Sequence, residues 1–204
     1  MGGRALVDHA LDGLATAGMR RAVVVTGYGA DEVEAHLAGR RWPLAVEPVR
    51  SADWRLPNGV SVLAAEPLLG GRDALLAMCD HLVAPALYAR VAAAGAGGGV
   101  RLGIDRRLGA AHVDPADVTC VATSGDRIVA IGKGLQPHDA YDTGVFAVGP
   151  ALFDALRRER APSLTHGVRA LARAGLARVV DCGALGWIDV DDPAALDQAE
   201  RLRA

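Results

Sequence analysis

The stretch RALVDHALDGLATAGMRRAVVVTGYGADEVEAHLA, residues 4–38, decides the fold class, because it predicts a helix, a strand and a second helix in succession. Residues 4–17 carry apolar side chains at helical spacing, and Gly18 fits the end of that helix. AVVVTG (22–27) is a short β-branched run closed by glycine, which is typical of a buried strand. Residues 30–38 then predict another helix.

The same alternation continues along the chain and predicts a mostly parallel α/β sheet. The next elements are a strand at 43–48, a turn followed by a helix within 58–69, a buried strand at 74–81 and a helix at 84–94. VTCVATSGDRIVAIGKGL (118–135) then reads as two strands joined by a Ser-Gly-Asp turn, which indicates an inserted β-hairpin. The remaining elements are a strand at 141–149, helices at 150–158 and 163–174, and a strand at 177–183. We expect one α/β domain over residues 1–204 with a small β insertion.

Composition excludes several classes of function. The chain has 204 residues, of which 51% are hydrophobic and only 4% aromatic, so the core must consist mainly of Ala, Val and Leu. Its formal net charge is −2 and its basic residues form no stripe, which argues against a nucleic-acid partner. The three cysteines lack metal-ligand spacing, which favours a reduced, cytoplasmic setting. No apolar run approaches the ~20 residues that span a bilayer, and no signal peptide is evident, so we expect no membrane insertion.

Aspartates crowd the stretch GWIDVDDPAALDQAERL (186–202). Asp192 before Pro193 has an ordinary explanation, because this pair is typical of a helix start. If residues 187–191 are extended, Asp189 and Asp191 share one face. Two like charges on one face repel unless a cation or a hydrogen-bond donor lies between them. The stretch therefore raises the question of a metal site.

A second aspartate is placed to share such a metal. Asp80 follows the buried strand 74–81, and Asp189 also lies near a strand end. Ligands of open parallel sheets bind at the carboxyl ends of the strands, although strand-end aspartates often only cap a helix. Mg²⁺ binds to one or two carboxylates and completes its shell with water and substrate phosphates, so Asp80 and Asp189 can hold it. We expect His81 to support this pair rather than to ligate the metal.

Five further residues, in three segments of the chain, are candidates for substrate contacts. Lys133, the single lysine of the chain, lies between two glycines, where it can bind a phosphate as a point charge or be a solvated turn residue. Asp142 and Thr143 precede a glycine and can bind substrate hydroxyls or stabilise a β-bulge. Asn58 and Gly59 can present backbone N–H groups to a base or a phosphate, or simply form a turn.

Taken together, these segments resemble the nucleotidyltransferase family. The matching segments occur in the family's order and are NGVSVLAAEPLL, LLAMCDHLV, RIVAIGKGL, YDTGVFAVGPALFDAL and WIDVDDPAALDQAERL. They look most like the inositol-1-phosphate cytidylyltransferase branch. The resemblance implies a Rossmann-like, sugar-phosphate nucleotidyltransferase fold with helices on both faces of the sheet. It also implies that CTP and a phosphorylated alcohol, such as inositol 1-phosphate, react to give a CDP-alcohol and pyrophosphate.

The resemblance also assigns roles to single residues. It implies that Asp80 and Asp189 hold Mg²⁺ and that Asp191 supports them. It places Asn58 and Gly59 near the nucleotide, and Lys133, Asp142 and Thr143 near the acceptor. His81 is a further candidate for substrate binding. The expected catalytic set is Asp80, Lys133 and Asp189.

One departure from the family is large. The family begins with a strand and a glycine-rich loop of the form LAAGxGxR, which surrounds the triphosphate. Here MGGRAL matches only the segment after that loop, and no other segment replaces the loop. The family's first strand lies between the strands that correspond to 22–27 and 74–81. We therefore expect either a sheet with a gap or a rearranged pairing, and poor catalysis by the chain as it stands.

Two alternatives remain open on the sequence. One is a non-catalytic descendant that binds a nucleotide or a partner protein. The other is a nucleotidyltransferase whose acceptor is a sugar phosphate or a phosphonate. The membrane-embedded alcohol phosphotransferase domain that often accompanies this branch is absent from the sequence, so we expect any such partner to be a separate protein.

Overall fold

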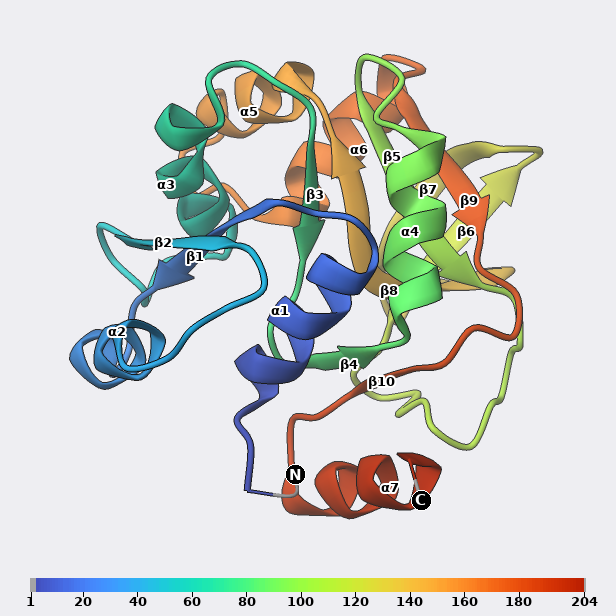
Figure 1. Ribbon diagram of the computed structural model, residues 1–204. Helices are drawn as coiled ribbons and strands as arrows, with labels where there is room; N and C mark the ends of the chain where they lie inside the picture. Colours follow the sequence, from blue (N-terminus) through green and yellow to red (C-terminus); the bar gives the residue numbers. More distant parts are fainter. Residues whose placement is uncertain (1–2, 204) are drawn as a thin grey trace.

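The computed structural model describes residues 3–203, with the side chains of all of them except 194 and 200–203 (Figure 1). The helices are α1 (Leu6–Thr16), α2 (Ala30–Ala38), α3 (Gly59–Leu69), α4 (Pro85–Ala94), α5 (Pro150–Arg157), α6 (Leu164–Arg173) and α7 (Pro193–Arg203). The strands are β1 (Arg21–Thr26), β2 (Ala45–Arg50), β3 (Ala74–Ala77), β4 (His81–Val83), β5 (Val100–Asp105), β6 (Thr119–Ser124), β7 (Arg127–Lys133), β8 (Ala140–Val148), β9 (Ala177–Asp181) and β10 (Trp187–Asp189). The predicted α/β class is confirmed.

The central sheet has six strands in the order β3-β8-β5-β9-β7-β6. Strands β3 and β5 each pair antiparallel with β8, and β5 pairs parallel with β9. It follows that β3, β5 and β9 run in one direction and that β8 runs against them. Among the described strand pairs of this sheet only β5–β9 is parallel, so the expected mostly parallel sheet is instead mixed, because β8 lies between β3 and β5 and the β6–β7 hairpin adds antiparallel pairs. The predicted hairpin of β6 and β7 is present, and β6 also pairs with β8 at Cys120↔Tyr141.

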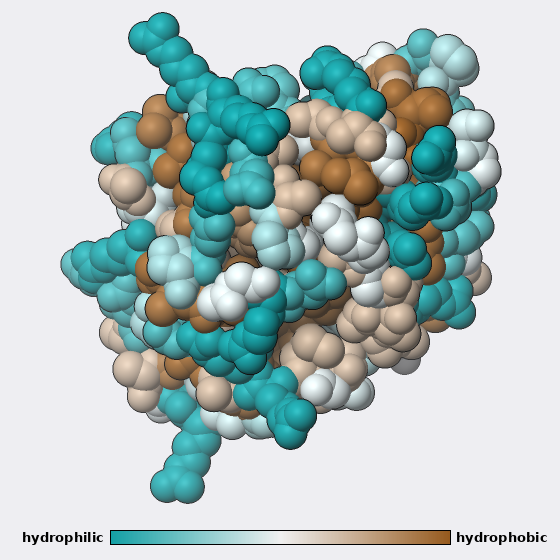
Figure 2. Space-filling view, turned by 90° about the horizontal axis from the view of Figure 1, so that it is seen from above, coloured by the Kyte–Doolittle hydropathy of each residue, from teal (hydrophilic) through white to brown (hydrophobic). Residues whose placement is uncertain are grey.

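Helices cover both faces of this sheet, as expected (Figure 1). Alternation along β8 shows the two faces: Phe146 packs with side chains of α5 and α6, whereas Val145 and Ala147 pack with side chains of α4. In the view from above, apolar residues reach the surface in separate places between polar ones (Figure 2). The side chains of β8 thus show that the sheet separates two apolar layers, one under α5 and α6 and one under α4.

The sheet has a gap between β1 and β3. Strands β1 and β2 form a separate parallel pair, and β3 pairs only with β8 among the described residues. Between β1 and β3 lies an apolar slot of about 580 Å³, whose walls include Val23, Val25, Leu75 and Ala77. The facing edges of β1 and β3 thus have no strand partner in the described part of the chain, which is unusual for interior strands. Of the two expected outcomes, the gap is the one observed.

A buried carboxylate helps to hold the outer β1–β2 unit in place. Asp8 of α1 is fully buried, and its oxygens lie 2.6 Å from His36 Nε2 and 2.8 Å from Arg40 Nη1. Burial alone would raise the pKa of Asp8, but the bonds and charges of His36 and Arg40 outweigh it and lower the pKa. These contacts fasten α2, which packs on β1 and β2, to α1.

The predicted strand 74–81 is divided in the structure, and this corrects the expectation. Strand β3 ends at Ala77, and β4 leaves the sheet to pair antiparallel with β10. The register places Asp189 opposite His81. The break occurs because β10, more than 100 residues later, offers β4 a partner outside the main sheet. This pairing brings Asp80 close to Asp189.

Candidate functional site

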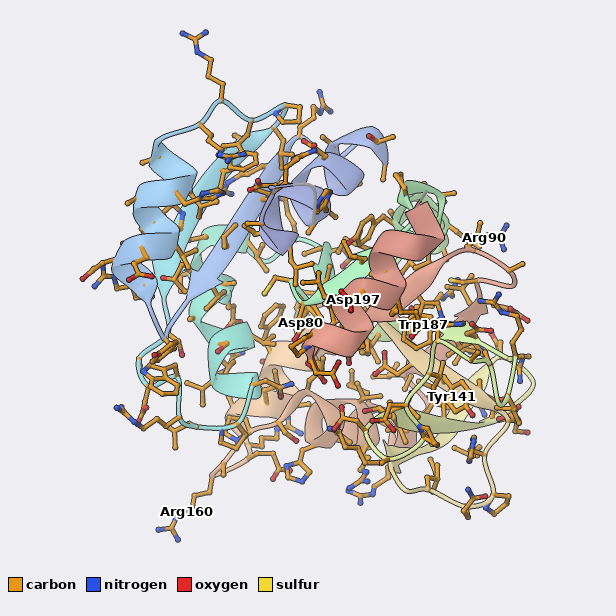
Figure 3. The ribbon with its side chains drawn as sticks, turned by 90° about the horizontal axis from the view of Figure 1, so that it is seen from below. Asp80, Arg90, Tyr141, Arg160, Trp187 and Asp197 are labelled. Carbon is orange, nitrogen blue, oxygen red and sulfur yellow. The ribbon has the colours of Figure 1, made fainter. Side chains whose placement is uncertain are left out.

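An acidic pocket of about 660 Å³ opens at the ends of β7 and β10 and beside β8, and it lies between the loop 106–118 and the start of α7. Its acidic lining residues are Asp80, Asp114, Asp117, Asp142, Asp189, Asp191 and Asp192. The basic groups in its lining are Lys133, His81 and His112. In the view from below, Asp80 and Trp187, which also lines the pocket, both lie beside α7 (Figure 3). An excess of carboxylates repels a phosphate ligand unless cations are added.

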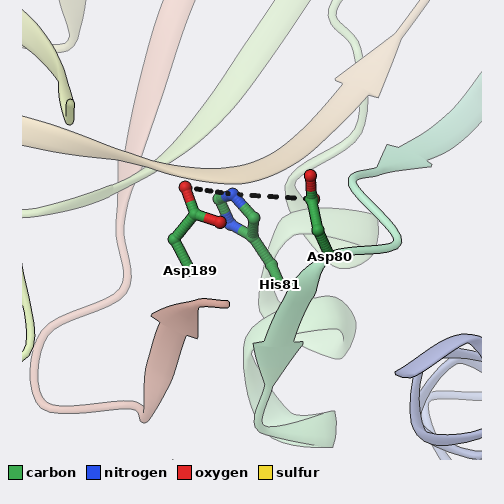
Figure 4. A group of neighbouring side chains, drawn as sticks. All are labelled: Asp80, His81 and Asp189. Carbon is green, nitrogen blue, oxygen red and sulfur yellow. Dashed lines mark ion pairs between the residues drawn. The ribbon is translucent and has the colours of Figure 1, made fainter. Parts of the chain in front are cut away.

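Asp80 and Asp189 converge in this pocket, with His81 between them (Figure 4). One oxygen of each carboxylate and one ring nitrogen of His81 lie within 4.8 Å of one another. His81 Nε2 is 3.3 Å from Asp189 Oδ2 and 4.0 Å from Asp80 Oδ1. The two aspartates come from different parts of the chain, as predicted, and the β4–β10 pairing is what aligns them.

His81 is held in one orientation and is positively charged at neutral pH. Burial favours the neutral ring, but the hydrogen bond and charge of Asp189 outweigh it and raise the pKa of His81 to about 9. On its other side, ring Nδ1 donates to the Thr143 carbonyl at 3.0 Å. A Cβ on Gly144, whose φ is +75°, would lie 2.4 Å from that nitrogen, so only glycine leaves room for the ring. The charged ring offsets part of the repulsion between Asp80 and Asp189.

The carboxylate pair suits a hard divalent cation. Mg²⁺ prefers oxygen ligands and is often held by one or two carboxylates. Asp189 Oδ1 is buried and has no hydrogen-bond partner among the described residues, so this oxygen has a free lone pair in the pocket. The donor set of Asp80 and Asp189 therefore fits Mg²⁺, and His81 is placed to orient Asp189.

Asp191 and Lys133 line the same pocket. Oxygens of Asp117, Asp189 and Asp191 lie within 4.8 Å of one another. Burial and the charges of Asp189 and Asp80 raise the pKa of Asp191. Lys133 Nζ lies 2.5 Å from Asp117 Oδ1, and this bond raises the pKa of the lysine. Lys133 is thus a fixed positive charge in the pocket, although its side chain is 60% exposed.

Asp142 lies in the pocket, but the side chain of Thr143 does not. Burial raises the pKa of Asp142 to about 6, and its Oδ1 accepts the Gly144 N–H at 2.7 Å. Thr143 is fully buried, and its hydroxyl donates to the Gly103 carbonyl at 2.8 Å. The β5–β8 register shifts at this point, so the β-bulge, one of the two alternatives at these positions, is present. The Thr143 side chain serves the bulge rather than the pocket lining.

Asn58 and Gly59 join the start of α3 to the segment before α6. Asn58 lines the pocket, and its Oδ1 accepts the Leu164 N–H at 2.8 Å. Gly59 is buried, and a Cβ there would lie 2.5 Å from the Pro162 carbonyl oxygen. Gly59 therefore allows a close approach of two segments, and its role toward a nucleotide stays a prediction.

Sequence reasoning missed a second buried aspartate beside the pocket. Asp105 ends β5 and contacts both Arg107 and Trp187. It also missed the loop 106–118 as a wall of the pocket, and Gln198, which donates to the Ala111 carbonyl and ties α7 to that loop. The sequence did carry one signal: Asp105 follows a mostly apolar segment, VRLGI, much as Asp80 follows the apolar segment ALLAMC.

None of the helices in the described residues is both long and apolar enough to cross a membrane.

No family model matches the chain. Among curated proteins, it is 34% identical over 185 residues to the bifunctional IPC transferase and DIPP synthase of Rubrobacter xylanophilus, which covers 88% of this chain and 41% of the relative. The protein of the same name from Aquifex aeolicus is 26% identical over 204 residues, covering 98% of this chain and 44% of the relative. The chain thus spans less than half the length of these relatives.

Solved structures agree. The inositol-1-phosphate CTP transferase from T. maritima superposes with a TM-score of 0.83 at 25% identity, covering 99% of this chain and 83% of that one. UTP-bound UGPase from Acinetobacter baumannii superposes with a TM-score of 0.75 at 15% identity, covering 98% of this chain and 82% of that one, and so supports the fold alone. The relatives, the fold and the order of the matching segments together place this chain in the nucleotidyltransferase family, near its inositol-1-phosphate cytidylyltransferase branch.

Proposed function

We propose that this chain carries the nucleotidyl-transfer site for CTP and inositol 1-phosphate. A phosphate oxygen of the alcohol phosphate attacks the α-phosphorus of CTP. The bond from the α-phosphorus to the oxygen that bridges to the β-phosphorus breaks, and the products are CDP-inositol and pyrophosphate. The named relatives support the choice of substrates. Catalysis of such a transfer consists largely of positioning and of neutralising charge.

The observation that carries this proposal is the convergence of Asp80 and Asp189 in one pocket. These two carboxylates would hold Mg²⁺, and Asp191 would support Asp189 through the pocket wall that they share. Bound Mg²⁺ neutralises the charge of the phosphates that the pocket aspartates would otherwise repel.

The other pocket residues fit the alcohol phosphate. Lys133 offers a positive charge to the acceptor phosphate. Asp142, with a pKa of about 6, can accept a hydrogen bond from an inositol hydroxyl. Asn58 also lines the pocket, and the resemblance assigns it to the nucleotide. A sugar phosphate offers the same two kinds of group, so the acceptor is best identified by experiment.

Efficient turnover needs donors around the triphosphate, and the basic groups in the described lining of the pocket are limited to Lys133, His81 and His112. In the family that this chain resembles, those donors come from a glycine-rich loop, which follows a strand that corresponds to a place between β1 and β3. We propose that the slot between β1 and β3 receives such a strand in the active enzyme. The slot's apolar walls and unpaired edges support this.

The test uses a loop-completed version, defined as this chain preceded by a strand and glycine-rich loop of the family form. It is incubated with CTP or UTP, Mg²⁺ and one acceptor at a time: inositol 1-phosphate, glucose 1-phosphate or a phosphonate. Mass spectrometry identifies the product, and pyrophosphate release gives the rate. We expect CDP-inositol to form fastest. Preference for another acceptor would reassign the substrate, and no product from any pair would favour the non-catalytic alternative.

A further inference from the structure

Asp105 is a buried carboxylate that the proposed chemistry does not use. It is fully buried at the end of β5, and Oδ2 lies 2.6 Å from Arg107 Nη2 and 2.9 Å from Trp187 Nε1. Its Oδ1 accepts the Arg107 backbone N–H at 2.9 Å. Burial opposes ionisation, but the bonds from Arg107 and Trp187 outweigh it and lower the pKa of Asp105. Asp105 is therefore an ionised anchor for an indole 82 residues away in sequence.

Trp187, which Asp105 holds by its indole N–H, contacts the ring of His81. The two rings are stacked, with centroids 6.0 Å apart and planes inclined by 21°. A second ring, that of His112 in the loop after β5, meets the indole edge-on, with the two ring centroids 5.4 Å apart. Trp187 is only 5% exposed, so the indole fills a fixed position between these rings. A displaced indole would leave one face of His81 without support.

His81 in turn contacts both members of the carboxylate pair. Its Nε2 lies 3.3 Å from Asp189 and 4.0 Å from Asp80, while the Thr143 carbonyl fixes the other ring nitrogen. Within the alignment that the β4–β10 pairing gives, the ring contacts Asp189 directly and lies within ion-pair distance of Asp80. A small shift of this ring changes where their oxygens point.

We propose that Asp105 is a positioning residue for the Asp80–Asp189 pair, acting through Trp187 and His81. The proposal rests on the proposed metal at that pair, to which Asp105 itself is not a ligand. Groups that orient metal ligands through hydrogen bonds typically change metal affinity by about 10–100-fold when they are mutated. The rings of Trp187 and His81 extend that influence from Asp105 to the carboxylates.

The test measures the binding of Mn²⁺ to the 204-residue chain. Electron paramagnetic resonance gives the concentration of free Mn²⁺ at each step of the titration. Mn²⁺ is used because it accepts the oxygen ligands that Mg²⁺ prefers. Asp105→Asn removes the charge of the anchor, and Trp187→Phe keeps an aromatic ring without the N–H donor. We expect each variant to weaken Mn²⁺ binding by about 10-fold or more. The double variant should lose no more than the stronger single one, since both act in one chain of contacts.

Two controls separate this role from general destabilisation. Asp139→Asn removes another carboxylate that pairs with an arginine and bonds to Thr123, but it has no contact with Trp187, so its affinity should equal that of the wild type. Asp189→Asn should abolish the binding. If the wild type fails to bind Mn²⁺, the proposed metal site and this role both fail. If it binds while Asp105→Asn and Trp187→Phe bind equally well, only the positioning role is wrong. Should Asp105→Asn not fold, Trp187→Phe alone decides by the same criterion.

Discussion

A strand added between β1 and β3 should stabilise the molecule substantially. Backbone N–H and C=O groups point alternately to the two sides of a strand, so about half of each strand faces the slot. For strands of six and four residues, that amounts to roughly ten unpaired backbone groups. Ordering the added strand costs about 1–2 kcal/mol per residue, which burial of its apolar side chains, at about 1.5–3 kcal/mol each, offsets. The hydrogen bonds, at about 0.5–1.5 kcal/mol each, then leave a net gain of at least about 5 kcal/mol.

The assay compares the thermal unfolding of this chain with that of the loop-completed version. For a protein of this size, each kcal/mol shifts Tm by about 2–4 °C, so we expect a rise of about 10–20 °C. A control version carries a Gly/Ser-rich extension of equal length and should show no rise. Hydrogen exchange should slow at the amides of β1 and β3. An unchanged Tm, or protection confined to other strands, would refute the idea that the slot is built for a strand.

Three further predictions rest on single contacts. Asp8→Ala should lower the free energy of unfolding by about 2–3 kcal/mol, because charge-assisted bonds to the half-exposed His36 and Arg40 are lost, whereas Asp12→Ala on the same helix should cost little. Folding lowers the pKa of Asp8, so the ionised carboxylate stabilises the folded protein above its unfolded pKa of about 3.9. This stabilisation is lost as the pH falls through the folded pKa. The free energy of unfolding of Asp8→Asn should not show this loss on acidification. Gly59→Ala should cost about 1–3 kcal/mol in urea unfolding because its Cβ meets the Pro162 carbonyl, while Gly186→Ala, with open space around it, should be near neutral. Lys133→Ala in the loop-completed version should raise the KM for inositol 1-phosphate more than the KM for CTP, and equal changes in both would count against its acceptor role.

The order of helices and strands was predictable because it depends on local patterns. Apolar residues repeat at helical spacing in α1, and the continuous apolar run at the end of β8 is typical of a strand that is buried on both faces. The helix start at Asp192 was also local: the Ala195 N–H donates to Asp192 Oδ1 at 2.7 Å. The gap beside β3 was expected from the resemblance, which showed which strand has no counterpart here.

The features that escaped prediction depend on contacts between distant segments. The break after Ala77 requires β10 as a partner for β4. The Asp105–Trp187 bond joins positions that no spacing rule connects. Thr143 was expected to reach the acceptor, but the bulge turns its hydroxyl to Gly103, and sequence alone does not give the direction of a side chain at a bulge.

The central claim is that nucleotidyl transfer takes place at the Asp80–Asp189 pair. The most direct measurement is the rate of pyrophosphate release by the loop-completed version with CTP, Mg²⁺ and inositol 1-phosphate. It compares the variants Asp80→Asn and Asp189→Asn with a control, Asp73→Asn, which lies at the opposite end of β3. Losing one well-placed charge-stabilising group costs on the order of 10²-fold in rate. We expect that loss, or a larger one, for Asp80→Asn and Asp189→Asn, and none for Asp73→Asn. Near-normal rates in both pocket variants would contradict the account, because the transfer would then take place elsewhere.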